Sequence, residues 1–115
     1  MRRVILESPY AGDVDANVTY ARACDVTYAR ACVRDSLWRG EAPIASHLLY
    51  TQPGVLVDGD PAERQWGIDA GLAWGAVADA TVVYTDRGVS SGMRYGIARA
   101  KAEGRPVEYR RLCAE

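Results

Sequence analysis

The sequence predicts a single α/β domain in which helices cover both faces of a parallel sheet of four to five strands. Short apolar segments rich in β-branched residues alternate along the chain with longer segments of helical spacing, and this alternation is typical of parallel strands joined by helical crossovers. The chain has 115 residues, which is enough for one core and too few for two. We therefore expect residues 1–115 to form one domain.

The first strand is predicted at Arg3–Glu7, where apolar residues follow two arginines. A loop follows at Ser8–Asp13, because its proline and glycine interrupt both strands and helices. Alanine, arginine and scattered apolar residues then favour a helix over Val14–Arg39, and Gly40 is a typical helix stop.

The middle of the chain is predicted to hold a short strand, an irregular segment and a second long helix. Ala42–Ser46 forms the strand, and His47–Val57 carries turn residues. Asp60 is a suitable N-cap for a helix that begins with Pro61 and runs to about Val77.

The last part of the chain repeats the pattern of strand, loop and helix. Ala80–Tyr84 is a short apolar run of the kind that a buried parallel strand needs, and Thr85–Gly92 is small or polar. Helical spacing resumes at Met93 and stops at Gly104, and Pro106–Arg110 gives a last short strand.

A segment of eight residues within the first predicted helix is duplicated. Residues 18–25 read VTYARACD and residues 26–33 read VTYARACV, so seven residues recur at a spacing of eight. Eight residues exceed two helical turns, so the two copies face directions about 80° apart. We expect either a first helix lengthened by about 12 Å or extra residues looped out near its start.

The second copy gives the first helix an apolar stripe, formed by Val26, Ala29, Val33 and Leu37. If the helix is lengthened, the first copy exposes apolar side chains, and this favours a homo-oligomer or a swapped helix. The residues concerned are Val18, Tyr20 and Cys24. The alternative is a tolerated insertion without function, natural or engineered.

Tryptophans on the predicted helices are interpreted as core or interface anchors rather than as a platform for stacking bases. Ile68 and Leu72 form part of a helical stripe that already requires apolar partners. The tryptophans are Trp38, Trp66 and Trp74.

Charge and composition exclude several classes of protein. The 14 basic and 15 acidic residues give a formal charge of −1, so the broad basic surface of a nucleic-acid binder is not expected. The apolar residues that follow the two N-terminal arginines end at Glu7, which is too short a run for a signal sequence or a membrane span. We therefore expect a cytoplasmic protein with neither nucleic acid nor membrane as its partner.

The three cysteines indicate neither disulfides nor zinc. Cys24, Cys32 and Cys113 lack CxxC spacing and have no histidine nearby, so we expect thiols in a reducing compartment. No metal or other cofactor is expected, because His47, the only histidine, has no companion ligands.

The loop after the central strand has the pattern of an anion site. Ser90, Ser91 and Gly92 precede a helix, where backbone N–H groups and the positive end of the helix attract an anion. Arg94 follows in the first turn, and its guanidinium can bind a phosphate through two hydrogen bonds. The alternative is that Arg94 is a solvated surface residue.

Three motifs, taken together, resemble the nucleoside 2-deoxyribosyltransferase-like superfamily. They are SPYAGD at residues 8–13, the dipeptide Ala78-Asp79 before the central strand, and SSGMRYGIA at residues 90–98. The resemblance is to small phage and bacterial members of unknown function, and it covers nearly the whole chain once eight residues are removed. It implies a three-layer, flavodoxin- or Rossmann-like fold that holds a nucleoside or nucleotide between the first and the last loop.

The resemblance also shows where the chain departs from the active transferases. In those enzymes a glutamate of a Gly-Met-Glu-Leu-Gly-like segment attacks the anomeric carbon, and aspartates help the base to leave. Arg94 stands in the place of that glutamate, and an arginine cannot act as the nucleophile. Gly71 stands where another aspartate is expected, and Asp69 is the nearest acid. Asp86 matches the superfamily's loop acid.

Asp86 and Asp69 are therefore the candidate catalytic residues. Asp86 ends the central strand, where its carboxylate can contact a ribose hydroxyl or act as a base. The alternatives are that Asp86 only forms a turn and that Asp69 lies on a solvated helix face.

The candidate ligand-binding residues come from the first loop, the segment after the second strand and the last loop. Tyr10 can stack on a base or bind a sugar, or it can pack in the core. His47 lies where an α/β pocket opens and titrates near neutrality, but a lone histidine is also commonly structural. The set comprises Ser8, Pro9, Tyr10, Ala11, Gly12, His47, Asp86, Ser90, Ser91, Gly92, Met93 and Arg94.

Three functional hypotheses remain open at this point. The first is a nucleotide-binding domain whose ancestral glycosyl transfer is lost or rebuilt around Asp86 and Asp69. The second is an N-glycosidic hydrolase or transferase that acts on nucleoside 5′-monophosphates through a different carboxylate. The third is a non-catalytic protein that sequesters a nucleotide signal. In each case the partner is a small nucleoside or nucleotide.

Overall fold

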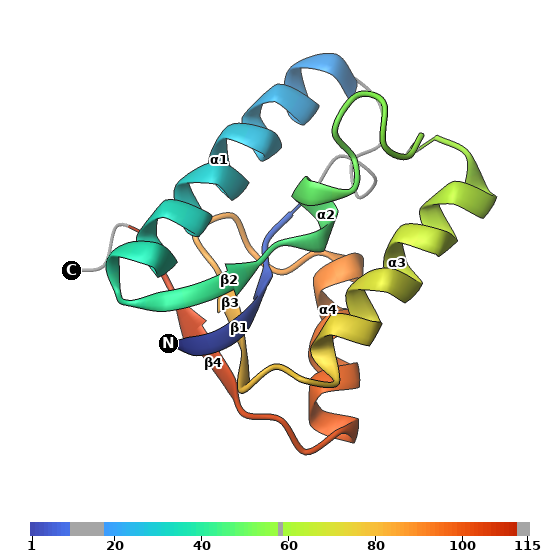
Figure 1. Ribbon diagram of the computed structural model, residues 1–115. Helices are drawn as coiled ribbons and strands as arrows, with labels where there is room; N and C mark the ends of the chain where they lie inside the picture. The colour runs from blue at the N-terminus through green and yellow to red at the C-terminus, as the bar shows by residue number, and fades with distance from the viewer. Residues whose placement is uncertain (10–17, 58, 113–115) are drawn as a thin grey trace.

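A four-stranded parallel sheet forms the centre of the protein. The computed structural model describes residues 1–9, 18–57 and 59–112, and the side chains from residue 26 onward in the first helix. Within this part the strands lie in the order β2-β1-β3-β4, and every pairing is parallel (Figure 1). The strands are β1 (Arg2–Glu7), β2 (Glu41–Ile44), β3 (Ala80–Tyr84) and β4 (Val107–Arg110).

Helices cover both faces of this sheet, as the sequence predicts. The first helix, α1 (Val18–Trp38), lies on one face and packs mainly along β2, whereas α3 (Pro61–Gly75) and α4 (Ser91–Ala102) lie on the other (Figure 1). A one-turn helix, α2 (Ser46–Leu49), follows β2. The predicted flavodoxin-like α/β fold is confirmed.

The core is divided by the sheet into two clusters. Every residue of β3 is buried, which agrees with its position inside the sheet. Val82 and Tyr84 belong to the cluster that includes Tyr28 of α1, and Val83 packs with Met93 of α4 on the opposite side. Successive residues of β3 thus supply opposite faces, as the pleat of a strand requires.

The first helix runs without a break through both copies of the duplicated segment, which agrees with a lengthened helix. It ends before Gly40, whose φ of 83° is the left-handed conformation that glycine adopts readily. The expected exposure of the first copy concerns the side chains of residues 18–25, which are not among those that the structure describes.

The buried face of α1 coincides only in part with the predicted apolar stripe. The buried positions are 28, 29, 32 and 36, whereas Leu37 is 51% exposed. Two of the buried side chains are polar: the Tyr28 hydroxyl donates to Asp86 at 2.7 Å and the Ser36 hydroxyl donates to Glu41 at 2.8 Å. Ala29 and Val33 of the predicted stripe do face the core, whereas a pattern built from apolar residues alone included Leu37 and left out Tyr28 and Ser36.

Two other expectations change near β2. The strand begins at Glu41 and ends at Ile44, and its proline is tolerated because β2 lies at the edge of the sheet. The segment His47–Val57, predicted to be irregular, begins within α2, where the N–H groups of Leu49 and Tyr50 bond to carbonyls four residues earlier.

The tryptophans do not lie in the core, contrary to one of the two predicted roles. Trp38 is 75% exposed, Trp66 is 67% exposed and Trp74 is 49% exposed. Trp66 and Trp74 are solvent-accessible because α3 buries only Gly75 among its residues. Their predicted role as interface anchors stays a prediction.

None of the helices in the described part of the chain has the length and apolar character needed to cross a bilayer.

Candidate functional site

A cavity of about 440 Å³ lies between α3 and α4 on one face of the sheet. It forms because α3 packs mainly against α2 and makes little contact with the sheet itself. The predicted apolar stripe of α3 consequently lines a space rather than a core: Ile68 and Leu72 are both partly exposed residues of its wall. A volume of this size suits a small organic ligand.

The cavity wall is contributed by five parts of the chain. Ile5 and Glu7 come from β1, and Arg105 comes from the turn before β4. The segment from α2 onward and the two helices supply the rest. These residues are Ser46, His47, Tyr50, Thr51, Leu56, Glu63, Arg64, Gln65, Gly67, Ile68, Gly71, Leu72, Gly75, Ser91, Gly92, Tyr95 and Gly96.

Glycines at every fourth position give α3 a flat inner face. A Cβ added at Gly71 would lie 2.5 Å from Ser46 Oγ, and one at Gly75 would lie 3.1 Å from the Arg105 guanidinium. One at Gly67 would lie 3.2 Å from Leu56. A larger residue at Gly71 would displace Ser46, whereas one at Gly67 or Gly75 would only crowd its neighbour.

The N-terminus of α4 opens at one end of the cavity. Ser90 is the N-cap: its hydroxyl accepts from the Met93 N–H at 3.3 Å, and its own N–H donates to Met93 Sδ at 3.4 Å. Ser91 and Gly92, the next two residues, line the cavity. Met93, another residue expected to bind ligand, has its side chain fully buried in the core beneath α4.

His47 and Ser8 form a pair beside the cavity. Ser8 Oγ lies 2.8 Å from His47 Nε2, and Ser8 is 2% exposed. Burial lowers the pKa of His47 to about 4, so the imidazole is neutral at physiological pH. A neutral imidazole has one donor and one acceptor nitrogen. Ser8 thus holds the ring from behind, and His47 is the member of the pair that lines the cavity.

Arg105 supports the cavity from the far end of α3. Its side chain is 8% exposed, its Nη1 donates to Gly75 O at 2.7 Å and to Glu103 at 2.6 Å, and its Nε donates to Thr81 at 3.0 Å. These bonds tie the C-terminal end of α3 to β3 and to the end of α4.

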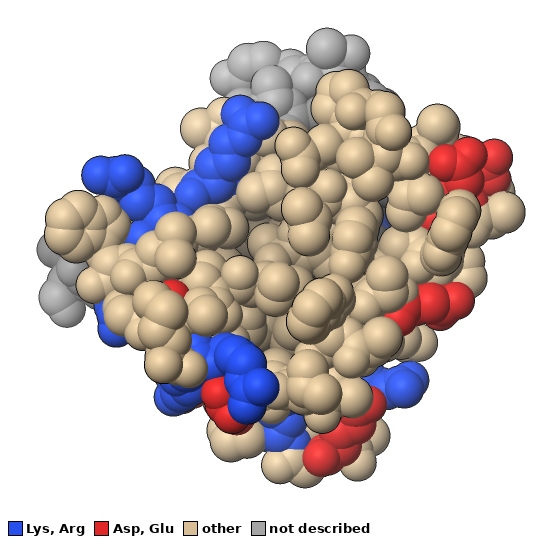
Figure 2. All heavy atoms as spheres, in the orientation of Figure 1, with Lys and Arg blue, Asp and Glu red and all other residues tan. Residues whose placement is uncertain are grey.

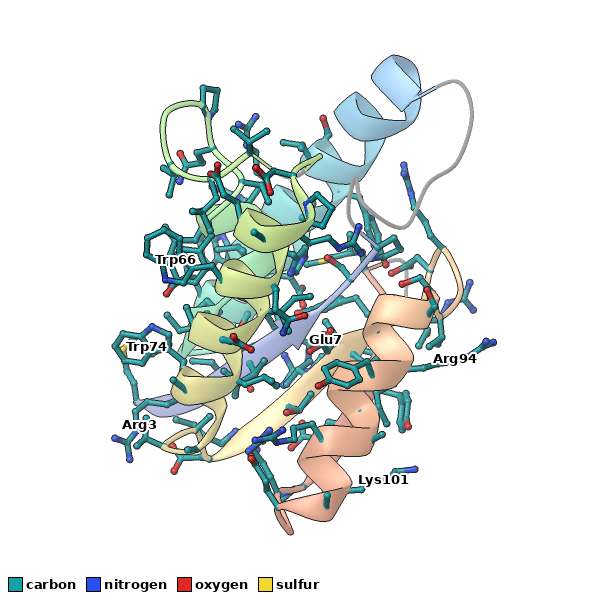
Figure 3. All side chains as sticks on the ribbon, turned by 90° about the vertical axis from the view of Figure 1, so that its right-hand side faces the viewer. Arg3, Glu7, Trp66, Trp74, Arg94 and Lys101 are labelled. Atoms are coloured by element: carbon teal, nitrogen blue, oxygen red, sulfur yellow. The ribbon has the colours of Figure 1, made fainter. Side chains whose placement is uncertain are left out.

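Glu7 is the residue of this site that the sequence analysis missed. The pattern placed it only at the end of a strand, yet the carboxyl end of a parallel strand is where α/β proteins bind ligands. Its half-buried carboxylate lines the cavity and packs against Gly96 of α4. Figure 3 shows Glu7 between α3 and α4.

Asp86, the first candidate for catalysis, is held on the side of α1. Its Oδ1 accepts from the Tyr28 hydroxyl at 2.7 Å and from the Leu112 N–H at 2.9 Å, and Oδ2 lies 3.1 Å from the same N–H. The Arg87 guanidinium stacks over the Tyr28 ring at 4.9 Å. Asp86 does not line the cavity, because these bonds direct its carboxylate toward α1 and the end of β4.

Asp69 and Arg94 also lie outside the cavity. Asp69 is exposed on α3 and accepts a hydrogen bond from Gln65 at 2.9 Å. This position is the one described by the alternative interpretation, in which Asp69 lies on a solvated face of the helix. Arg94 is exposed on the side of α4 that faces away from Glu7 (Figure 3). The helical register explains this, since Ser91, Gly92, Tyr95 and Gly96 take the inner positions.

The structure thus brings together three of the residues expected to bind ligand: His47, Ser91 and Gly92. Ser8 and Pro9 are buried behind the wall. Tyr10, Ala11 and Gly12 lie outside the described residues.

Charge is distributed in small groups around the site. On the face drawn in Figure 2, acidic side chains gather along the edge formed by α3, and Lys and Arg form no continuous patch among the residues drawn in colour. Nor does the described part of the chain contain a group of three or more His, Cys, Asp or Glu residues that could hold a metal ion.

Comparisons with known proteins agree with this architecture. A family model described as a domain of unknown function (DUF7768) matches residues 2–110. Among solved structures, the chain is similar to a 2-deoxyribosyltransferase from the psychrotolerant bacterium Bacillus psychrosaccharolyticus, with a TM-score of 0.60 and 18% sequence identity. That similarity covers 98% of this chain and 74% of the other, and at this identity it shows the fold alone. No curated protein matches the chain significantly.

Proposed function

The chain belongs to the DUF7768 family, and we propose that it binds a nucleotide or nucleoside in the cavity between α3 and α4. The observation that carries this proposal is the position of the cavity, which adjoins both the carboxyl end of β1 and the N-terminus of α4. In open α/β sheets this is the edge where ligands bind. A nucleoside is proposed as the ligand by analogy, because the solved structure of similar fold is that of a 2-deoxyribosyltransferase.

The N-terminus of α4 is where a phosphate would bind. Ser91 and Gly92 line the cavity in the first turn of α4, the end at which the helix dipole favours an anion. The Ser91 hydroxyl is a further donor. The predicted contribution of Arg94 is not part of this proposal, because that side chain lies on the outer side of α4.

We further propose that binding proceeds without turnover. The two carboxylates considered for catalysis, those of Asp86 and Asp69, lie outside the cavity. Of the two acids that do line it, Glu63 accepts a hydrogen bond from the Val57 N–H at 2.9 Å, and Glu7 is assigned below to binding the ligand rather than to attacking it. The ligand would then be held and released unchanged, as in the hypothesis of a sequestering protein.

Isothermal calorimetry against nucleosides and nucleoside 5′-monophosphates tests the proposal. We expect saturable binding, tighter for the monophosphates, and the bound ligand recovered intact after the protein is denatured. The absence of heat and of any thermal stabilisation across the whole panel would contradict the proposal. Release of free base would contradict binding without turnover.

Ser91→Asp is the matched variant for the phosphate site. A carboxylate in the first turn of α4 favours the helix but repels a bound phosphate, so folding is preserved while monophosphate affinity falls by about tenfold or more. Nucleoside affinity should change less. Ala98→Asp is the control, because it adds the same charge at an exposed position of the same helix outside the cavity.

A further inference from the structure

Glu7 occupies a position in the cavity from which it can select among nucleotides. It is the last residue of β1, so its backbone is fixed by pairing with β3, where Glu7 is opposite Val83. Its side chain is half-buried in the wall between α3 and α4 (Figure 3). An ionised carboxylate here accepts hydrogen bonds and donates none, so the part of the ligand that meets it must be a donor.

Gly96 makes room for this carboxylate. A Cβ at position 96 would overlap both carboxylate oxygens of Glu7, so a larger residue there would displace the side chain. Gly96 lies in the second turn of α4 and lines the cavity with Glu7. The position of this carboxylate is therefore set by two residues that are far apart in the sequence, Glu7 on β1 and Gly96 on α4.

The spacing along α4 relates this position to the phosphate site. Gly96 follows Gly92 by four residues, which is about 6 Å along the helix axis. This is comparable to the separation between the phosphate of a 5′-nucleotide and the 2′ and 3′ hydroxyls of its sugar. A phosphate at Ser91 and Gly92 would thus leave the ribose beside Gly96 and Glu7.

We propose that Glu7 accepts hydrogen bonds from the ribose hydroxyls, so that the cavity prefers ribonucleotides over 2′-deoxyribonucleotides. A carboxylate can accept from both hydroxyls of a vicinal diol, as acidic residues do in dinucleotide-binding α/β proteins. A 2′-deoxy sugar offers only one of these two donors. This inference rests on the proposed nucleotide site and adds to it which sugar the site takes.

Calorimetry with matched pairs of ligands tests the inference. The probes are the four ribonucleoside 5′-monophosphates and their 2′-deoxy counterparts, titrated into the full chain. We expect the best ribonucleotide to bind about 10- to 100-fold more tightly than its 2′-deoxy counterpart, which is the range for one hydrogen bond to a charged group. Equal affinity for both members of every pair would overturn the role of Glu7 and leave the nucleotide site standing. Binding of neither member would overturn the proposed function itself.

Two variants assign the preference to Glu7. Glu7→Gln should weaken the ribonucleotide and leave the 2′-deoxy ligand nearly unchanged, so that the preference falls below about threefold. Gly96→Ala keeps the carboxylate but displaces it, and it should reduce the preference in the same way while favouring the helix. Asp69→Asn removes a carboxylate outside the cavity and should retain the full preference. A preference that persists in a folded Glu7→Gln or Gly96→Ala protein would overturn the proposal.

Discussion

Glu41 shows how a single buried carboxylate ties the sheet together. Its side chain is 9% exposed, and its Oε2 lies 2.5 Å from Nη2 of Arg110, while Ser36 donates to its Oε1 at 2.8 Å. The hydrogen bonds from Arg110 lower the pKa of Glu41 to about 2, against the opposing effect of burial. Since Glu41 begins β2 and Arg110 ends β4, this ion pair links the two edge strands of the sheet.

This pairing predicts a pH dependence of stability. The pKa of Glu41 is lower in the folded protein than in the unfolded chain, so its contribution is complete above the unfolded-state pKa and is lost as pH falls toward about 2. The pKa shift corresponds to about 3 kcal/mol. Urea unfolding at stepped pH should therefore show Glu41→Gln less stable at pH 7, with a smaller loss of stability between pH 5 and pH 2 than the unchanged protein. An unchanged acid slope would contradict the assignment, and Asp69→Asn controls for the loss of one exposed charge.

Asp86 is expected to act on stability rather than on ligand binding. Its carboxylate accepts from the Tyr28 hydroxyl and from the Leu112 N–H, so it joins α1 to the segment after β4. Asp86→Asn should lower the free energy of unfolding by about 1–3 kcal/mol, because an amide cannot accept both bonds as well as a carboxylate does. Nucleotide affinity should stay within about twofold. A large loss of affinity in a fully folded Asp86→Asn protein would restore the contact with the ligand that the sequence predicts for Asp86.

At the scale of the element, the duplication in α1 allows two deletion variants to be compared, each of which lacks one of the two copies. Removal of residues 18–25 and removal of residues 26–33 produce chains that differ at one position only, because the copies are identical except for Asp25 and Val33. In the second deletion the aspartate takes the place of Val33, which packs against the core cluster beneath α1.

We expect both deletion variants to fold, since each keeps one copy to supply the buried face of α1. The variant that lacks residues 26–33 should be less stable by about 1–3 kcal/mol, because a carboxylate then meets an apolar surface. Chemical unfolding of the two variants measures the difference directly. Equal stabilities would show that α1 docks through another register of its sequence.

The elements that the sequence predicted well are those that one local signal determines. Asp60 caps α3 through bonds to the N–H groups of Ala62 and Glu63, and Gly40 ends α1, as their residue types indicate. The buried face of α1 could not be predicted from apolar spacing alone, because the hydroxyls of Tyr28 and Ser36 are satisfied in the core by Asp86, which is 58 residues away in the sequence, and by Glu41 of β2.

At the scale of the whole molecule, the site depends on how far α3 stands from the sheet. The helical spacing of Ile68 and Leu72 is visible in the sequence, but the distance of α3 from the sheet is not, so a core stripe was expected where a cavity forms. Glu7 was missed for the same reason: its position at a strand end predicts a ligand contact only once the space above β1 is known to be open. The loop at Ser90 to Gly92 was found in advance, because capping residues and glycine mark a helix start locally.

The same arrangement makes α3 easier to open than α4. It buries only Gly75 and packs mainly on α2, whereas α4 buries Met93, Ile97 and Ala100 against the sheet. Local opening free energies follow such differences in buried contact. Native-state hydrogen exchange should therefore show that the amides of residues 61–75 exchange through openings of lower free energy than those of residues 91–102.

A ligand in the cavity touches both helices and stabilises the closed form by mass action. Saturating nucleotide should therefore slow exchange in α3 far more than in α4, and at the same nucleotide concentration the effect should be smaller in Ser91→Asp and unchanged in Ala98→Asp. If α3 and α4 exchange only together, through global unfolding, then α3 is not a separate wall of the cavity but part of one cooperative core.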